Sequence, residues 1–284
     1  MKLALGTVQF GVNYGISNNS GIPTATAIKK VFTTAHSVKI NTFDTALAYG
    51  NAEQNIAPYL QKNDCVISKF PKNSSSKSIR LSLKQSLNNL KLNNLYGYMA
   101  HNANDIINDE DLWKVLIDLK NEKLVSKIGY SLYTTEELEK LLSLNYIPQI
   151  IQIPYSLLDR KFEPYFQILK SYNTEVHTRS TFLQGLYFLN PNLLPEILLP
   201  LKDALIQLQL ISQKNNYPIS NIALQFVLSN KNIDKVVIGV LNDNQLLENY
   251  ELAEKKIENL SIFEEINQII IKDKHLLNPA NWQK

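Results

Sequence analysis

The sequence predicts an α/β protein in which eight parallel strands alternate with helices and close into a (β/α)8 TIM barrel. Short apolar runs recur eight times along the chain, and most of them lack interspersed polar residues. Such runs are typical of parallel strands that are covered on both faces, and segments with helical period lie between them. No Gly-, Ser- or Pro-rich linker divides the sequence, so we expect a single domain over residues 1–284.

The expected strands are short and recur at intervals of roughly 30 residues, as in a barrel of this class. They are Lys2–Gly6, Ile40–Asp44, Cys65–Lys69, Leu95–His101, Lys127–Ser131, Ile150–Pro154, Glu175–Arg179 and Lys235–Gly239. An open doubly wound sheet is the main alternative. It is disfavoured because no G-x-G-x-x-G follows the first run and no G-x-x-x-x-G-K-[ST] occurs anywhere.

Helices are expected between the strands. Two apolar stripes are Leu81, Leu83, Leu87, Leu90 and Leu92, and Leu112, Val115, Leu116 and Leu119. The expected N-caps are Thr24, Asp109, Thr134 and Asp243. Helical stretches near 200–214 and 220–230 both precede the last strand, so one of them is an insertion. A terminal helix is expected over Ile257–Lys274.

Composition excludes several classes of protein. The chain is 44% hydrophobic, and its net charge of +3 is too small to require nucleic acid as a partner. Cys65 is the single cysteine; we expect a small buried thiol in a reducing cytoplasm, and no intramolecular disulfide is possible. No signal-peptide core opens the chain, and no window approaches the roughly 18 apolar residues of a membrane span. We therefore expect a cytoplasmic protein with no membrane partner.

Polar residues stand at the ends of three consecutive strands, where barrels of this class carry their chemistry. The second strand ends at Asp44 and leads on to Tyr49, the third ends at Lys69, and the fourth ends at His101. Each residue alone has an ordinary structural explanation, as a cap, a core tyrosine or a solvated strand end. Together they suit a site that gives a proton to a carbonyl oxygen while hydride reaches the carbon.

Each of the four residues has an expected part in that reaction. Tyrosine titrates near pH 10, so we expect the ammonium of Lys69 to lower the pKa of Tyr49, the proton donor. Asp44 would hold Lys69 protonated, and His101 would orient the substrate oxygen. No side chain supplies hydride, so the mechanism implies a nicotinamide cofactor.

These residues resemble the active-site pattern of the aldo-keto reductase superfamily. The matching motifs are Leu5-Gly6-Thr7, Phe43-Asp44-Thr45-Ala46-x-x-Tyr49-Gly50-x-x-Glu53, Lys69 and His101, and later Gly129-x-Ser131, Gln152–Asp159, Gln184-Gly185 and Ile238-Gly239 with Gln245–Asn249. The resemblance covers essentially the whole chain. It implies an oxidoreductase that uses NAD or NADP to interconvert a carbonyl and an alcohol, with Asp44, Tyr49, Lys69 and His101 as its catalytic tetrad and without a metal.

The resemblance also implies a cofactor site across the barrel mouth. Its residues would be Gly6, Thr7, Asp44, Ser131, Gln152, Arg179, Ser180, Gly185, Gly239, Asn242, Gln245, Glu248 and Asn249. Ser131 and Gln152 would hydrogen-bond the nicotinamide amide, the loop from Ser180 to Gly185 would cover the pyrophosphate, and the segment from Gly239 to Asn249 would hold the adenosine end. That segment lacks the Lys and Arg that many NADPH-dependent relatives use for the 2′-phosphate. This favours NAD or mixed use unless Lys231 or Lys235 reaches it.

The expected substrate is a small carbonyl compound. Predicted substrate contacts are Phe10, Tyr14, Tyr49, His101 and Arg179, with Gln9 and His177 as further candidates, and His177 is more often a core residue. Arg179 replaces the family's usual aromatic residue, and three roles for it stay open: stacking on the nicotinamide, binding an anionic substrate, or a structural salt bridge. The segment Gly6–Gly11 and the compact chain resemble reductases of bacterial surface-sugar synthesis, which implies a sugar-like carbonyl.

Two other functions stay open at this point. A Schiff-base lyase or aldolase would use Lys69 as its nucleophile, but it needs a lysine of depressed pKa, whereas Asp44 would raise that pKa. A low-turnover NAD(P)-binding regulatory module would act through a partner. No long exposed apolar helix or charge run marks a partner surface, so we expect no obligate protein partner.

Overall fold

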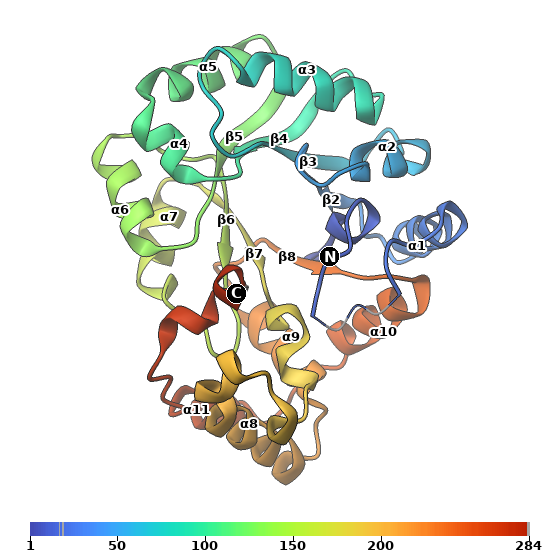
Figure 1. Cartoon of the computed structure of the whole chain (residues 1–284), viewed down its shortest axis with the longest axis vertical. Helices are drawn as coiled ribbons and strands as arrows, with labels where there is room; N and C mark the ends of the chain where they lie inside the picture. The colour runs from blue at the N-terminus through green and yellow to red at the C-terminus, as the bar shows by residue number, and fades with distance from the viewer. Residues whose placement is uncertain (17, 19, 283–284) are drawn as a thin grey trace.

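The computed structural model describes residues 1–16, 18 and 20–282, and its strands close into a parallel barrel (Figure 1). The strands are β1 (Leu3–Gly6), β2 (Thr42–Asp44), β3 (Cys65–Phe70), β4 (Leu95–Ala100), β5 (Val125–Ser131), β6 (Ile150–Pro154), β7 (Glu175–Arg179) and β8 (Lys235–Gly239). Each strand pairs with the next in the sequence, and β8 pairs with β1. The predicted barrel is therefore confirmed, and its strand ends lie within two residues of the expected ones.

Helices surround the barrel, as Figure 1 shows. They are α1 (Ala25–Ser37), α2 (Ala52–Ile56), α3 (Ile79–Leu90), α4 (Ala103–Asn108), α5 (Glu110–Asn121), α6 (Thr135–Ser143), α7 (Phe166–Ser171), α8 (Lys202–Asn215), α9 (Ile219–Ser229), α10 (Asp243–Glu254) and α11 (Ser261–Asn267). The two helices expected before the last strand are α8 and α9. None of the helices in the described part of the chain is long and apolar enough to cross a membrane.

Most of the predicted N-caps are confirmed. Thr24, Asp109 and Thr134 each accept a backbone N–H at the start of a helix, and Thr134 forms a capping box with Glu137. The cap of α10 is Asn242, whose side chain accepts from the Gln245 N–H at 2.9 Å. The prediction of Asp243 is thus wrong by one residue.

Two helix predictions need correction. Leu81 is 71% exposed, whereas Leu83 and Leu90 are buried in α3. At about 100° per residue, Leu81 lies on the opposite side of the helix from Leu83. The terminal α-helix is only the short α11, and two single-turn 3₁₀ helices, Lys274–Leu277 and Pro279–Trp282, follow it. A run of three isoleucines, 269–271, follows α11, and β-branched residues disfavour a helix.

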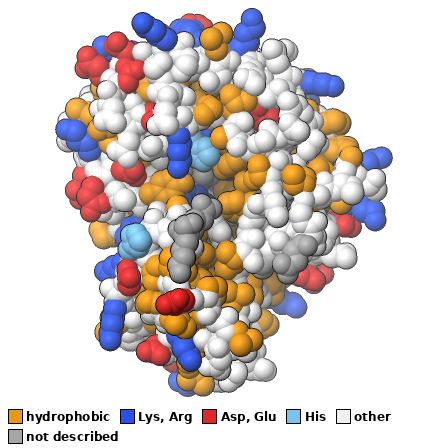
Figure 2. Space-filling model, in the orientation of Figure 1, with side chains coloured by type: hydrophobic (Ala, Val, Ile, Leu, Met, Phe, Trp, Pro, Cys, Tyr) orange, Lys and Arg blue, Asp and Glu red, His pale blue; other side chains and the backbone are white. Residues whose placement is uncertain are grey.

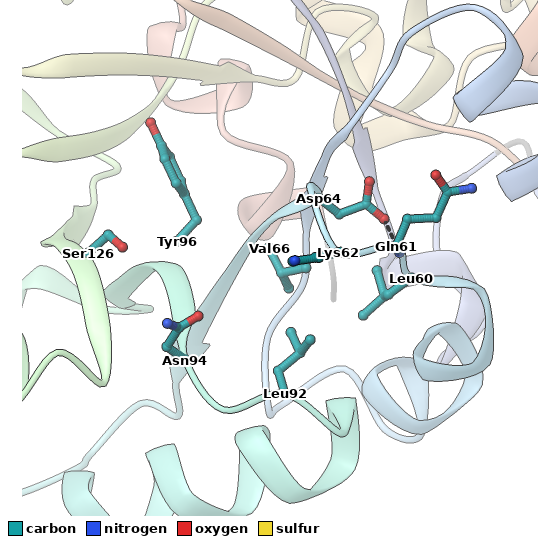
Figure 3. Close-up of a pocket in the computed structure, with 9 residues that line it drawn as sticks. All are labelled: Leu60, Gln61, Lys62, Asp64, Val66, Leu92, Asn94, Tyr96 and Ser126. Atoms are coloured by element: carbon teal, nitrogen blue, oxygen red, sulfur yellow. Dashed lines mark hydrogen bonds between the residues drawn. The ribbon is translucent and has the colours of Figure 1, made fainter.

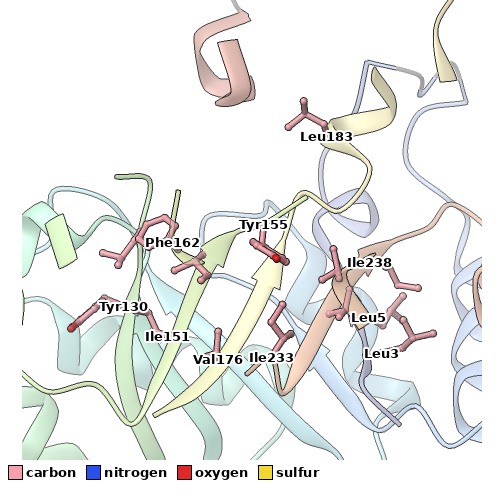
Figure 4. Close-up of a cluster of buried hydrophobic side chains, with 14 of the residues drawn as sticks. Leu3, Leu5, Tyr130, Ile151, Tyr155, Phe162, Val176, Leu183, Ile233 and Ile238 are labelled. Atoms are coloured by element: carbon pink, nitrogen blue, oxygen red, sulfur yellow. The ribbon is translucent and has the colours of Figure 1, made fainter. Parts of the chain in front are cut away.

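The main core lies between the outer face of the barrel and the helices. Figure 4 shows part of it, with Ile151, Val176 and Ile238 on the neighbouring strands β6, β7 and β8. Seen from outside, charged side chains lie mainly around the rim of the face in Figure 2 and hydrophobic ones around its centre. Cys65 is only partly buried, which corrects the expectation of a buried thiol.

The barrel interior is filled below the mouth. Ile67, Met99 and Ile150 form a fully buried apolar cluster there. The strands approach closely at Gly129, where a Cβ atom would lie 1.7 Å from the Ile150 carbonyl oxygen. Only glycine fits this position.

A charged cluster occupies the base of the interior. Glu175 accepts from Tyr96 Oη at 2.7 Å and pairs with Lys127, and its other oxygen lies 2.6 Å from His177 Nε2. Burial acts to raise the pKa of Glu175, but the hydrogen bonds from His177, Lys127 and Tyr96 outweigh it and hold that pKa well below the ordinary value.

Candidate active site at the carboxyl ends of the strands

Strand periodicity places the predicted site directly above the interior apolar cluster. Side chains alternate along a strand, so residues two positions apart share a face. Lys69 and Gln152 follow Ile67 and Ile150 by two residues and are fully buried at the mouth. The register also aligns Gly6 of β1 with Asp44 of β2. The carboxyl ends of these strands therefore bring their polar side chains together.

An ion-pair network holds the centre of the site. Lys69 Nζ donates to Asp44 Oδ1 at 2.7 Å, to Oδ2 at 2.8 Å and to the Thr45 carbonyl at 3.1 Å. Gln152 Nε2 donates to Asp44 Oδ2 at 2.8 Å. Asp44 and Lys69 are both buried, so each charge is compensated by the other and by neutral hydrogen-bonding partners. The sequence did not predict the hydrogen bond from Gln152 to Asp44, because the two residues are 108 positions apart in the chain.

The same network makes Lys69 a poor nucleophile. Burial lowers its pKa, and the neighbouring Asp44 acts in the opposite direction without cancelling that effect. Asp44 therefore raises the pKa of Lys69 as expected, but burial outweighs it and leaves the pKa below its ordinary value. An ammonium has three N–H donors, and all three are used on Asp44 and Thr45. No lone pair is available for Schiff-base chemistry, which disfavours the aldolase alternative.

Tyr49 lies in the loop after β2, half-buried, beside both Lys69 and His101. Its ring centroid is 5.5 Å from Lys69 Nζ and 5.5 Å from the His101 ring, which meets it edge to face. The predicted depression of its pKa is corrected: burial first, then the charge of Asp44, raise the pKa of Tyr49 well above its ordinary value. Burial disfavours the charged phenolate, and the nearby negative charge of Asp44 adds to that effect.

His101 is a neutral imidazole at physiological pH. Burial, followed by the charges of Lys69, Lys72 and Arg179, lowers the pKa of His101 to about 3. Its Nδ1 atom is buried and has no hydrogen-bonding partner among the described residues. A neutral imidazole carries one N–H donor, which suits a contact with a carbonyl oxygen.

Arg179 closes the mouth on the side of β7. Its guanidinium lies 4.4 Å from the ring centroid of Tyr133, and it donates to the Leu132 carbonyl at 2.9 Å and to Ser180 Oγ at 3.3 Å. No carboxylate lies within ion-pairing distance of Arg179 in the described part of the chain. Of its three open roles, the structural salt bridge is therefore not observed.

Several predicted cofactor residues lie on the strand ends around this network. Gly6 pairs with Gly239 across β1 and β8, and Ser131 pairs with Gln152 across β5 and β6. Thr7 is buried, and its hydroxyl donates to the Asp44 carbonyl at 3.1 Å.

The predicted pyrophosphate loop after β7 has an unusual backbone. Ser180, Leu183 and Gln184 have positive φ values of 66°, 47° and 54°, and Gly185 has a φ of 94°. Non-glycine residues in this region are strained, and strain of this kind concentrates at ligand-binding segments. The hydroxyl of Thr181 is buried there without a partner among the described residues.

The predicted adenosine residues lie at the start of α10. Asn242 caps the helix, and Gln245 Oε1 accepts from the Leu241 N–H at 2.8 Å. Glu248 and Asn249, which are exposed and half-buried respectively, follow on the same helix. Lys235 begins β8, at the opposite end of the strand from Gly239, and its Nζ donates to the Met1 carbonyl at 3.1 Å. Lys235 therefore does not reach the adenosine end.

The predicted substrate contacts divide into two groups. Tyr14 lies at the mouth, where its hydroxyl accepts from Gln184 Nε2 at 2.8 Å. Phe10 is fully buried and packs near Phe32 of α1, so its prediction as a substrate contact is wrong. The aromatic signal of Phe10 reflected core packing. His177 is fully buried in the charged cluster at the base, as a core residue.

Gln9 lies at the mouth over the end of β8. Its side-chain amide occupies the space next to Gly239, where a Cβ atom would come within 2.2 Å of Gln9 Nε2. Gln9 Oε1 is buried and has no partner among the described residues.

The sequence did not predict two residues that lie at the mouth. Tyr133 follows β5 and packs against Arg179, and Lys72 follows β3 with its Nζ 5.6 Å from the Tyr133 ring centroid. Neither belongs to a motif. The only available signal was their position a few residues beyond a strand end.

A cavity of about 280 Å³ lies away from this site (Figure 3). It is lined by Asp64, Val66, Tyr96 and Ser126, among others, which flank the first residues of β3, β4 and β5. That is the amino end of the strands, opposite the predicted catalytic residues. In barrels of this class, residues at the amino end of the strands contribute to stability, whereas the chemistry takes place at the carboxyl end.

Comparison with known proteins agrees with this geometry. The model of the Aldo/keto reductase family matches residues 2–270. The chain belongs to the aldo-keto reductase family.

Solved aldo-keto reductases share the fold. The holo form of an aldo-keto reductase from Bacillus halodurans aligns with a TM-score of 0.77 at 20% identity, covering 97% of this chain and 95% of that one. A glycerol dehydrogenase from Gluconobacter oxydans aligns with a TM-score of 0.74 at 18% identity, covering 98% and 93%. At these identities the likeness concerns the fold alone. No curated protein sequence matches the chain.

Proposed function

We propose that this aldo-keto reductase uses a nicotinamide cofactor to reduce a carbonyl group to an alcohol, with Tyr49 as the proton donor. The observation that carries the proposal is the placement of the Tyr49 ring edge to face against His101, beside the buried Lys69–Asp44 pair. Family membership supports an oxidoreductase. The cofactor and the roles of single residues are our inference.

The residues at the mouth fit a nicotinamide dinucleotide. Two buried polar atoms have no partner among the described residues: Gln9 Oε1, next to the predicted cofactor residue Gly239, and Thr181 Oγ1, in the loop predicted to cover the pyrophosphate. Unpaired buried polar groups are costly, so such atoms indicate a missing hydrogen-bonding partner. Ser131 and Gln152 would bind the carboxamide, Gln152 through the oxygen left free by its bond to Asp44. The strained loop after β7 would cover the pyrophosphate.

The bound cofactor supplies hydride to the carbonyl carbon. Tyr49 Oη gives its proton to the carbonyl oxygen, so that hydride plus proton convert the carbonyl into an alcohol, and water returns a proton to the phenolate. His101 donates a hydrogen bond to the same oxygen and fixes its position. Lys69 lies beside the phenolate as it forms, and Asp44 holds Lys69 in place.

The raised pKa of Tyr49 favours the reductive direction. The phenol is protonated at neutral pH, and a general acid must begin the reaction with its proton. Alcohol oxidation needs the phenolate, which burial disfavours. We therefore propose that reduction is the faster direction near pH 7.

NAD is the preferred cofactor in this proposal. The first turn of α10 contains Asp243 and no cation, and Lys235 lies at the other end of β8. A 2′-phosphate at this position would lose water without gaining a cationic partner. The substrate is a small polar carbonyl compound of the sugar-like kind; one structural relative is a glycerol dehydrogenase, which acts on a polyol.

Comparing wild type with Tyr49→Phe tests the proposal. NADH-dependent reduction of an aldehyde should fall about 10²- to 10⁴-fold in kcat, the usual contribution of a general acid, with NADH binding retained. Tyr172→Phe, a change at an exposed tyrosine of the outer surface, is the matched control and should keep full activity. Full turnover by Tyr49→Phe would refute the proposed role.

A further inference from the structure

Two cations lie against one aromatic ring at the mouth of the proposed active site. Arg179 Cζ is 4.4 Å and Lys72 Nζ is 5.6 Å from the centroid of Tyr133. The backbone N–H of Tyr133 donates to Glu137 Oε2 at 2.7 Å as part of the cap of α6, which fixes the root of this side chain. The loops after β3 and β5 and the last residue of β7 thus bring the two cations together on this ring.

Neither cation forms an ion pair with a carboxylate in the described part of the chain. No carboxylate lies within 4.0 Å of Lys72 or Arg179 in the residues that the structure describes. The nearby acids have other partners or are shielded. Asp44 is paired with Lys69, and Glu137 accepts from the backbone of Tyr133. Asp105 is buried, which raises its pKa; backbone hydrogen bonds from Asn73 and Ser74 and the charge of Lys72 act in the opposite direction.

The positive charge also reaches the reacting end of the site. Lys72 and Arg179 both act on the titration of His101, and Arg179 acts on that of Tyr49. Lys72 is exposed and Arg179 is half-buried, so both cations are within reach of a ligand that enters the mouth. Arg179 uses two N–H groups on Leu132 and Ser180, and its other N–H groups have no partner among the described residues.

We propose that Lys72 and Arg179 bind an anionic group of the substrate, so that the enzyme reduces carbonyl compounds bearing a carboxylate or a phosphate ester. The inference rests on the proposed function and names its substrate class. A guanidinium matches both groups in a two-point hydrogen bond, and an ammonium adds a mobile point charge. Tyr133 is a positioning residue, because both cations pack against its ring.

Matched pairs of aldehydes test the substrate class. The first pair is 4-carboxybenzaldehyde and the neutral methyl 4-formylbenzoate; the second is D-glyceraldehyde 3-phosphate and D-glyceraldehyde. With NADH, the anionic member of at least one pair should have a kcat/KM about tenfold higher or more, the value of one charge-assisted hydrogen bond. The pair that shows the preference identifies the group as carboxylate or phosphate. Equal values within both pairs would overturn the inference.

Variants assign the preference to the two cations. Lys72→Gln and Arg179→Gln should each lower the anionic-to-neutral ratio by about fivefold or more, mainly through KM, and added salt should shrink the wild-type ratio. Lys77→Gln removes an exposed cation from the same loop region and is the matched control; it should leave the ratio unchanged. A ratio unaffected by Arg179→Gln, combined with weaker NAD⁺ binding, would place Arg179 in the cofactor site and overturn the inference.

A binding measurement separates this inference from the proposed function. Calorimetric titration of the NAD⁺-loaded protein with 4-(hydroxymethyl)benzoate and with inorganic phosphate needs no turnover. Binding of either anion in wild type that is lost in Arg179→Gln supports the anion site even if every aldehyde is inert. Absence of both binding events and of any rate preference would contradict the anion site while leaving reduction of neutral aldehydes intact.

Discussion

Asp44→Asn removes the charge that compensates the fully buried ammonium of Lys69. In the structure Asp44 accepts two hydrogen bonds from Lys69 Nζ and one from Gln152, and Lys69 has no exposed surface. Breaking a buried ion pair from one side typically costs about 3–5 kcal/mol of unfolding free energy. An asparagine oxygen still accepts one of these hydrogen bonds, so we expect a stability loss of about 3 kcal/mol. This is a large part of the roughly 5–15 kcal/mol unfolding free energy of a typical domain.

Urea unfolding followed by tryptophan fluorescence measures this loss, and a double-mutant cycle assigns it. Asp44→Asn combined with Lys69→Met leaves no charge unpaired, so the double variant should be more stable than the sum of the single losses predicts, by about 1–3 kcal/mol. Without the carboxylate, burial lowers the pKa of Lys69 further below its value of about 10.4 in the unfolded chain. The unfolded state then binds more protons, so the stability of Asp44→Asn should rise from pH 6 to pH 9.

Two results would refute this reasoning. One is a loss below about 1 kcal/mol for Asp44→Asn, which is the value of a solvent-exposed pair. The other is strict additivity of the two single variants, which would mean that Asp44 and Lys69 do not interact.

The remaining predictions concern packing, acid stability and pH dependence. Gly129→Ala places a Cβ 1.7 Å from the Ile150 carbonyl oxygen, so the variant should lose more than about 4 kcal/mol or fail to fold; a melting temperature equal to wild type would contradict this. Glu175→Gln should be less stable than wild type at pH 7. The pKa of Glu175 is depressed in the folded state, so the deficit should shrink as the pH falls below about 4, and urea midpoints that differ equally at all pH values would refute it. Because the pKa of Tyr49 is raised, kcat/KM for reduction should show no fall due to Tyr49 up to about pH 10; a tyrosine titration near pH 7 would refute it.

The barrel was predictable because its signals are local. Continuous apolar runs mark strands covered on both faces, and the caps at Thr24, Asp109 and Thr134 mark helix starts. The predictions that failed concern residues whose environment is decided by tertiary packing. Phe10 had the right residue type for a pocket wall, but the position of α1 decided that it belongs to the core. Ile269 to Ile271 read as helix by hydrophobicity, although β-branched side chains disfavour it.

The candidate site was predictable in its members and less so in its electrostatics. Strand ends located Asp44, Lys69 and His101 at one rim. The direction of the pKa of Tyr49 depends on how deeply the fold buries the phenol and how near it places Asp44, which sequence order does not contain. Tyr133 and Lys72 lie in loops whose conformation only the folded chain determines.

A crystal structure with NAD⁺ and 4-(hydroxymethyl)benzoate bound would test the central claim most directly. We predict that the alcohol oxygen lies within about 2.6–3.2 Å of Tyr49 Oη, also contacts His101, and leaves the carboxylate between Lys72 and Arg179. An alcohol oxygen beyond hydrogen-bonding distance of Tyr49, with the nicotinamide away from the ends of β2 to β4, would contradict the proposed chemistry.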